Sequence, residues 1–166
     1  MFISFHANIS YQSVQFVERL LLNQVGKEGA SAAILLCTGG GDSAAGVGLY
    51  HLMRALPYPI HVHAAGMCAS GGVSTLAGGT RRTCSPGTYF MLHGSKAPDG
   101  TLSPQAGMTR DIYKTQFGWD HSKLDYFFSS VDEKWFDETA ALEHGLVDAV
   151  QAFSFPANAT VHFVPN

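Results

Sequence analysis

The sequence predicts a single α/β domain built on a mostly parallel sheet. Short apolar runs alternate with segments whose apolar residues recur at helical spacing, and glycine-rich turns join several of them. The chain of 166 residues shows no internal repeat, low-complexity tract or linker. A chain of this length is long enough to bury a core of its own. We therefore expect residues 1–166 to form one domain.

The first half of the chain carries the clearest signals of regular structure. A short strand is expected over 2–5, followed by a helix that Ser10 or Ser13 caps. The continuous apolar run 32–37 is typical of a strand buried on both faces of a parallel sheet. The remaining expected elements of this half are a helix over about 44–56, a strand over 60–65 and a short helix over about 73–77.

The second half is expected to add shorter elements around one long helical segment. Two short strands, 82–84 and 89–92, flank a turn that contains Pro86 and Gly87. The remaining expected elements are a helical segment from about 104 to 128, a last helix over 137–144 and a closing strand over 146–153.

Composition and charge exclude several classes of function. Apolar residues make up 46% and charged residues 14%, with a net charge of −3 and no run of Lys or Arg, so nucleic-acid binding is not expected. The apolar stretches are too short to span a bilayer, and the first residues do not form a signal peptide, so we expect a cytoplasmic protein. The odd set of cysteines (Cys37, Cys68 and Cys84) contains no Cys-x-x-Cys and suits a reducing compartment.

The turn 66–72 offers a candidate nucleophile. Ser70 lies between a strand and a helix and is followed by two glycines, which lifts its hydroxyl out of the sheet and exposes the flanking N–H groups. These N–H groups and the helix N-terminus favour the negative charge that develops during acyl transfer. The alternative is that Ser70 only caps the following helix.

A second glycine-rich turn, 38–43, follows the strand 32–37. One interpretation is a phosphate-binding loop, but the turn lacks both Gly-Lys-Ser/Thr and Gly-x-Gly-x-x-Gly. A second interpretation is that Gly40 or Gly41 donates an N–H to an oxyanion. The third is a tight turn without a ligand.

A serine nucleophile needs a base and an acid that orients the base. His93 is the strongest candidate base, because it ends a short apolar strand and enters a loop. The side chains of His61 and His63 share a strand face but lack an evident third ligand, so no metal site is expected. The spacing does not choose among the candidate acids, which are Asp132, Glu133 and Asp137.

Taken together, these segments resemble the ClpP-type serine peptidases of the ClpP/crotonase superfamily. The resemblance runs from about Ile3 to Val150. Four stretches carry it, in order: 36–50 with the glycine-rich turn and its helix, 66–82 with Ser70 and its helix, 91–93 with His93, and 140–148 with Gly145-Leu146-Val147-Asp148.

The resemblance implies a fold and a mechanism. It implies the ClpP/crotonase-like fold of repeated β-β-α/βα units, with Ser70 as nucleophile and His93 as general base. The N–H groups of Gly40 and Gly71 would form the oxyanion hole, and the family's aspartate falls on Glu133 when the alignment is read back from residues 145–148. The expected substrate is a peptide or an unfolded protein, and no cofactor or metal is required.

The chain also departs from the family pattern. Gly39 replaces the family's proline, and Glu133 its aspartate. The segment 95–131 corresponds to the family's handle and is shorter than in the housekeeping subunit, and the N-terminal gating extension is not seen. These features argue against an ATP-dependent unfoldase as partner. We expect a ring-like homo-oligomer with the aromatic-rich stretch 113–128 as a contact surface. The alternatives are a catalytically inactive assembly subunit and a crotonase-type acyl-CoA enzyme.

Overall fold

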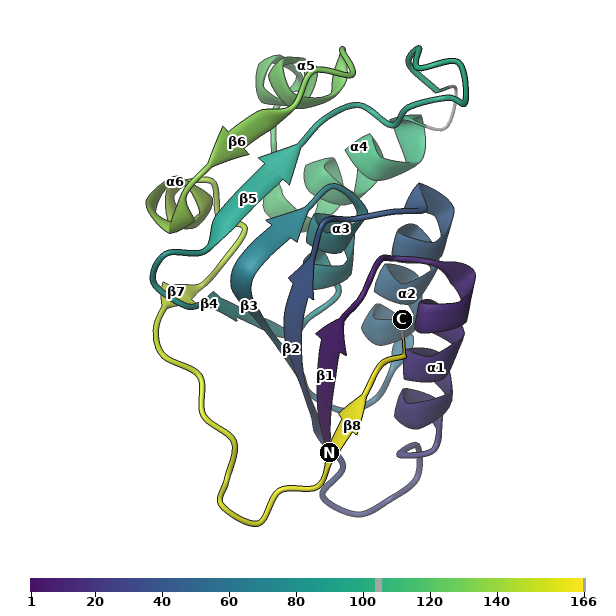
Figure 1. Cartoon of the computed structure of the whole chain (residues 1–166), viewed down its shortest axis with the longest axis vertical. Helices are drawn as coiled ribbons and strands as arrows, with labels where there is room; N and C mark the ends of the chain where they lie inside the picture. The colour runs from purple at the N-terminus through teal and green to yellow at the C-terminus, as the bar shows by residue number, and fades with distance from the viewer. Residues whose placement is uncertain (104–105, 166) are drawn as a thin grey trace.

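The computed structural model describes residues 1–103 and 106–165, and an eight-stranded sheet forms its centre (Figure 1). The order along the sheet is β6-β5-β3-β2-β1-β8, with β4 beside β3 and β7 beside β4. Of the described strand pairs, only β5–β6 is antiparallel. The predicted α/β fold with a mostly parallel sheet is therefore confirmed. The strands are β1 (Phe2–His6), β2 (Ala32–Thr38), β3 (Ile60–Ala69), β4 (Arg81–Cys84), β5 (Tyr89–Leu92), β6 (Lys134–Phe136), β7 (Ala149–Val150) and β8 (Val161–Phe163).

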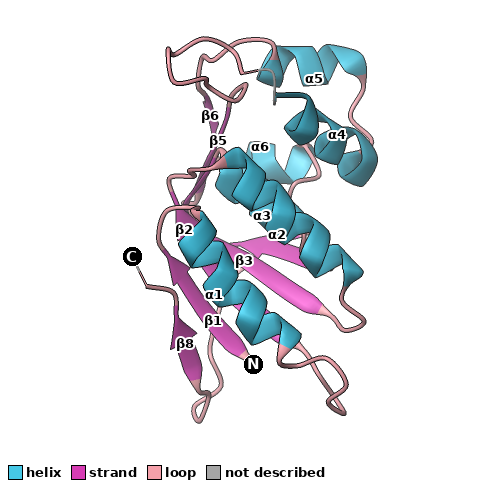
Figure 2. Cartoon of the chain, turned by 90° about the vertical axis from the view of Figure 1, so that its right-hand side faces the viewer, coloured by secondary structure: helices cyan, strands magenta, loops and turns pink. Residues whose placement is uncertain are grey.

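Three helices, α1 (Tyr11–Leu22), α2 (Ser43–Ala55) and α3 (Gly71–Ala77), cover one face of the sheet (Figure 2). Alternate residues of β2, including Ile34 and Leu36, are therefore fully buried beneath them. The residues between them are only half-buried, because they point to the opposite face. The expectation that this strand is buried on both faces is wrong for that reason.

The bend in β3 positions the functional edge of the sheet. The strand is longer than the predicted 60–65 and turns at Gly66, whose φ of +75° favours glycine. Its first half pairs with β4 and its second half with β5. The strand thus carries Ala69 and the following Ser70 to the carboxyl end of β5.

The predicted helical segment 104–128 is two helices, α4 (Ala106–Phe117) and α5 (His121–Phe128), and its first two residues lie outside the described part. Gly118, at φ +65°, ends the first helix, and the Asp120 side chain caps the second by accepting the Lys123 N–H. The aromatic stretch 113–128 mostly fills the protein's own core. Of its large apolar side chains only Tyr126 is well exposed, so the stretch as a whole does not form the apolar surface that was expected.

The last part of the chain returns to the opposite edge of the sheet. Helix α6 (Glu138–Glu143) begins after Asp137 and is followed by Gly145, close to the prediction. The predicted strand 146–153 is reduced to β7, because Phe153 leaves the sheet to pack against His61 and His63. Strands β6 and β8 were not predicted from the sequence, and β8 pairs with β1 beside the N-terminus (Figure 1). No described helix is long and apolar enough to cross a membrane.

Candidate active site

Ser70 occupies a strained turn between β3 and α3. Its φ of +52° and ψ of −120° make it the one residue other than glycine with a positive φ among those described. Such a conformation costs about 1–3 kcal/mol and persists where neighbouring contacts impose it. Here the Ser70 N–H donates to the Met91 carbonyl at 2.7 Å. Ser70 stands at the N-cap position of α3, but its side chain makes no capping bond to the helix, so its hydroxyl is not used as a cap.

His93 lies beside Ser70 because their strands are neighbours. Ala69 of β3 is opposite Met91 of β5 in the parallel register, so the residues that follow the two strands meet at one edge of the sheet. The Oγ of Ser70 and the Nε2 of His93 are 2.8 Å apart. This distance is that of a hydrogen bond between a nucleophile and a general base.

The surroundings of His93 favour its neutral form. Burial lowers the pKa of the imidazole from its usual 6.5, and the nearby Lys96 and Lys134 lower it further. The Gly94 backbone and Glu133 act in the opposite direction without reversing the change. At neutral pH the ring is therefore uncharged and able to accept a proton at Nε2.

The acid expected to orient His93 makes no described hydrogen bond with it. The Nδ1 of His93 is buried and has no hydrogen-bond partner among the described residues. Glu133 lines a cavity that Ser70 and His93 also line. However, its Oε2 accepts a hydrogen bond of 3.0 Å from Nε1 of Trp135. Its Oε1 lies 3.7 Å from Nζ of Lys96. The structure brings Ser70 and His93 together and leaves the third group unassembled.

The two other candidate acids are less well placed. Asp137 accepts the Ala140 N–H at 2.9 Å as the cap of α6, so its carboxylate is committed to the helix. Asp132 is exposed and is not among the residues described around the Ser70 cavity, whereas Glu133 is. Glu133 is thus the best placed of the three carboxylates.

The two candidate oxyanion donors differ in orientation. Gly71 is the first residue of α3, so its N–H belongs to the group that a helix leaves without an intrahelical acceptor. Gly40 packs against the nucleophile turn, since a Cβ built there would lie 2.7 Å from the Ala69 oxygen. Its N–H, however, donates to Oγ1 of Thr38 at 3.1 Å. In this conformation the Gly40 amide is held by its own turn.

Gly41 is the other donor that the sequence left open. The residues on either side of it bond to Ile9: the Gly40 oxygen accepts from Ile9 and the Asp42 N–H donates to it. The N–H of Gly41 therefore points away from Ile9, as alternate groups do along a paired strand. Gly41 also lines the cavity that contains Ser70 and His93.

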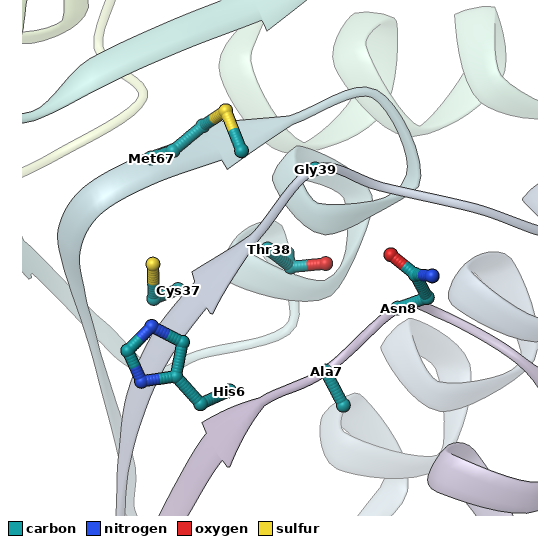
Figure 3. Close-up of a pocket in the computed structure, with 7 residues that line it drawn as sticks. All are labelled: His6, Ala7, Asn8, Cys37, Thr38, Gly39 and Met67. Atoms are coloured by element: carbon teal, nitrogen blue, oxygen red, sulfur yellow. The ribbon is translucent and has the colours of Figure 1, made fainter. Parts of the chain in front are cut away.

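Three cavities adjoin this edge of the sheet. An open one of about 370 Å³ lies in front of Ser70 and is also lined by Lys96 and Glu133. A narrow one of about 10 Å³ lies behind Ser70. A third, of about 310 Å³, lies across the Thr38–Gly39 segment, where His6 and Cys37 occupy neighbouring strands and Met67 extends towards Gly39 (Figure 3).

The remaining titratable candidates have structural partners. The hydroxyl of Thr83 lies 2.7 Å from Nε2 of His61 and 2.6 Å from Nδ1 of His63. The described residues contain no group of three or more His, Cys, Asp or Glu side chains that could hold a metal ion. Cys68 and Cys84 are buried, and burial raises the pKa of the Cys84 thiol to about 11.

Sequence reasoning missed several residues that shape the site. Thr38 holds the Gly40 amide, and Trp135 and Lys96 hold the carboxylate of Glu133. No local sequence pattern predicts these contacts. The hydrogen bond between Ser43 and Ser95 joins positions 52 residues apart, so only the folded chain reveals it.

The fold and the geometry define a class: an α/β protein whose strained serine meets a histidine at the carboxyl edge of a parallel sheet. The family model for Clp protease matches residues 2–116, a span that includes Ser70 and His93 and ends before Glu133. The chain belongs to the Clp protease family.

Individual relatives agree with this assignment. The ATP-dependent Clp protease proteolytic subunit 1 of Mycobacterium leprae is 30% identical over 122 residues, which cover 67% of this chain and 61% of the relative. The protein of the same name from Borreliella burgdorferi is 30% identical over 133 residues, covering 67% of this chain and 63% of the relative. The matched part thus spans about three fifths of these relatives.

A solved structure shows the same fold. An engineered variant of ClpP1 from Listeria monocytogenes superimposes with a TM-score of 0.79 over 90% of each chain, at 16% sequence identity. The ClpP-like fold predicted from the sequence is therefore confirmed.

Proposed function

We propose that this chain is a serine peptidase that cleaves peptide bonds through an acyl-enzyme at Ser70. The observation that carries the proposal is the 2.8 Å hydrogen bond between Oγ of Ser70 and Nε2 of His93, made from a strained backbone conformation. The family membership and the names of the relatives, which are proteolytic subunits, support a peptide or unfolded protein as substrate.

The proposed reaction has two halves. The Oγ of Ser70 attacks the substrate carbonyl while Nε2 of His93 takes the hydroxyl proton, and the same proton passes to the leaving amine as the C–N bond breaks. Water then attacks the ester while His93 takes its proton, and this proton returns to Oγ of Ser70 as the C–O bond breaks and the acid is released. Backbone N–H groups of Gly71 and of Gly40 stabilise the oxyanion, and the Gly40 amide must first leave Thr38.

We assign the third catalytic position to Glu133. Its cavity position supports this role, and its bonds to Trp135 and Lys96 mark the described arrangement as a resting one. Rotation of the carboxylate towards Nδ1 of His93 satisfies a buried polar atom that has no partner among the described residues. No cofactor or metal takes part.

A catalytically inactive assembly subunit is the second candidate. The Nδ1 of His93, which no described residue bonds, favours it, because an enzyme that works without aligning its base loses much of its rate. The third candidate, a crotonase-type acyl-CoA enzyme, would have no use for the Ser70–His93 hydrogen bond. A CoA-binding assay would detect such an enzyme.

Hydrolysis of a peptide library followed by mass spectrometry separates these candidates. The wild-type protein is expected to release fragments, and Ser70→Ala is expected to release none. Ser122→Ala, which changes an exposed serine on α5, is the matched control and should retain full activity. Cleavage by Ser70→Ala at the wild-type rate would place the activity elsewhere, and no cleavage by any of the three would favour the inactive subunit.

The assembly proposed for the chain is a ring-like homo-oligomer of single-domain subunits in the cytoplasm. The segment 95–131, proposed as the handle, exposes Leu102, Met108 and Tyr126, which are apolar side chains suited to a contact between copies. The relatives are named ATP-dependent, whereas the shortness of this segment argues against an unfoldase partner. Sedimentation velocity is expected to show an oligomer, and a monomer at all concentrations would contradict the ring.

A further inference from the structure

The narrow cavity behind Ser70 is enclosed by the proposed catalytic residues and by two helices of the segment 95–131. Ser70 and His93 form one side, while Thr109 of α4 and Phe128 of α5 form the other. Its volume is about 10 Å³. About 10–15 Å³ of such space is needed for one water molecule, so the cavity accommodates one water-sized group.

This cavity adjoins the larger one in front of the nucleophile. Four residues, Ser43, Ser70, His93 and Ser95, line both spaces. The Oγ atoms of Ser43 and Ser95 are 3.1 Å apart, which places a hydrogen bond at the boundary between the two spaces. A peptide in the larger cavity with its carbonyl at Ser70 therefore lies beside the narrow one.

We propose that this cavity receives the side chain that precedes the cleaved bond, and that its size restricts that residue to glycine or alanine. The inference rests on the proposed peptidase function. A methyl group is close to a water molecule in size, so alanine fits without rearrangement. A leucine side chain fits only if the wall moves.

The wall is poorly suited to move. Phe128 is 1% exposed and packs with its ring centroid 4.8 Å from that of Tyr113, while Thr109 is 8% exposed. Forcing extra methylenes into a packed interior displaces side chains from their preferred rotamers. A single methylene in such a pocket changes the rate by roughly 10- to 200-fold, so the three further carbons of leucine meet a stronger restriction than one carbon does.

The test uses diphenyl phosphonate esters of acetylated amino acids whose side chain is that of alanine, leucine or phenylalanine. In this reaction Oγ of Ser70 bonds to phosphorus, the P–O bond to one phenoxide breaks, and the hydroxyl proton leaves with phenol through His93. Intact-mass spectrometry follows each adduct over time. A small ethyl fluorophosphonate, which carries no such side chain, measures the reactivity of Ser70 itself.

We expect the alanine probe to modify the wild-type protein at least about 10-fold faster than the leucine or phenylalanine probe. Phe128→Ala enlarges the cavity and is expected to reduce or reverse this ratio. Phe127→Ala is the matched control, because Phe127 is equally buried but is not among the residues described around the cavity. It should keep the wild-type ratio.

Each outcome decides the matter. Leucine equal to or faster than alanine in the wild-type protein overturns the proposed restriction, and this result does not depend on any variant folding. An equal shift in Phe127→Ala and Phe128→Ala shows that the cavity is not the cause. Failure of all three amino-acid probes while the small fluorophosphonate reacts also overturns the inference. If the fluorophosphonate also fails to modify the wild-type protein, both the peptidase proposal and this inference are overturned.

Discussion

At the scale of single residues, the chemistry of the site depends on three polar groups with different degrees of alignment. Ser70 and His93 are hydrogen-bonded, while the carboxylate of Glu133 accepts a hydrogen bond from Trp135 instead. The ion pair with Lys96 adds little, because both side chains are 44% exposed and such pairs contribute about 0–1 kcal/mol. The indole hydrogen bond is therefore the main contact to break if Glu133 is to reach His93.

Replacing Trp135 by Phe tests this account. The substitution keeps an aromatic ring on β6 and removes the donor to Glu133, a hydrogen bond worth about 1 kcal/mol. We expect the rate of Ser70 modification by a fluorophosphonate to rise by up to roughly fivefold. The increase should vanish in the double variant with Glu133→Gln. An increase of the same size in the double variant would show that Glu133 is not the acid.

At the scale of elements, the site depends on close packing between α2 and the beginning of α3. A Cβ added to Gly46 would lie 2.9 Å from the Gly71 oxygen, so α2 approaches the nucleophile turn as closely as backbone atoms allow. At Gly48, two residues further along the same helix, no described atom outside the helix's own backbone lies within 4 Å of the corresponding position. The two glycines have the same helical setting and opposite surroundings.

Alanine substitutions at these two glycines should act in opposite directions. Gly48→Ala is expected to stabilise the protein by about 0.5–1 kcal/mol through helix propensity. Gly46→Ala is expected to destabilise it by about 1–3 kcal/mol and to slow the modification of Ser70, because the turn must shift. Urea unfolding measures the first effect and fluorophosphonate labelling the second. Equal stability of the two variants would contradict the packing.

At the scale of the whole molecule, the order of elements was readable from the sequence and the long-range contacts were not. The turns around Ser70 and after residue 38 have strong local glycine signals, which explains why these parts of the fold were predicted well. Gly118 and Asp120 are local signals for the break between α4 and α5. The apolar spacing on both sides of them is helical, so the segment was predicted as one helix. The direction of the Gly40 amide depends on backbone angles that no residue pattern specifies.

The buried histidine on β3 links the stability of the whole fold to pH. His63 is fully buried against Thr83, Ser85 and Phe153, and burial, reinforced by the neighbouring His61, lowers its pKa from 6.5 to about 4. Because the folded pKa lies below the unfolded one, the unfolded state binds the proton first. The stability that the neutral, buried His63 contributes is fully present above pH 6.5 and is lost as the pH falls towards 4.

Urea unfolding at a series of pH values should show this loss. The wild-type free energy of unfolding is expected to fall between pH 6.5 and 4, with at most about 3 kcal/mol of the decrease due to His63. The decrease should be smaller in His63→Gln. His121→Gln, which alters an exposed histidine, should follow the wild type. The same pH dependence in His63→Gln as in the wild type would contradict the assignment.

The most direct test of the central claim is intact-mass spectrometry after treatment with a fluorophosphonate. The account predicts one adduct on the wild-type protein, no adduct on Ser70→Ala and a strongly slowed reaction on His93→Ala, with all three proteins folded by circular dichroism. An adduct of equal yield on Ser70→Ala, or no adduct on the folded wild-type protein, would contradict the claim that Ser70 is an activated nucleophile.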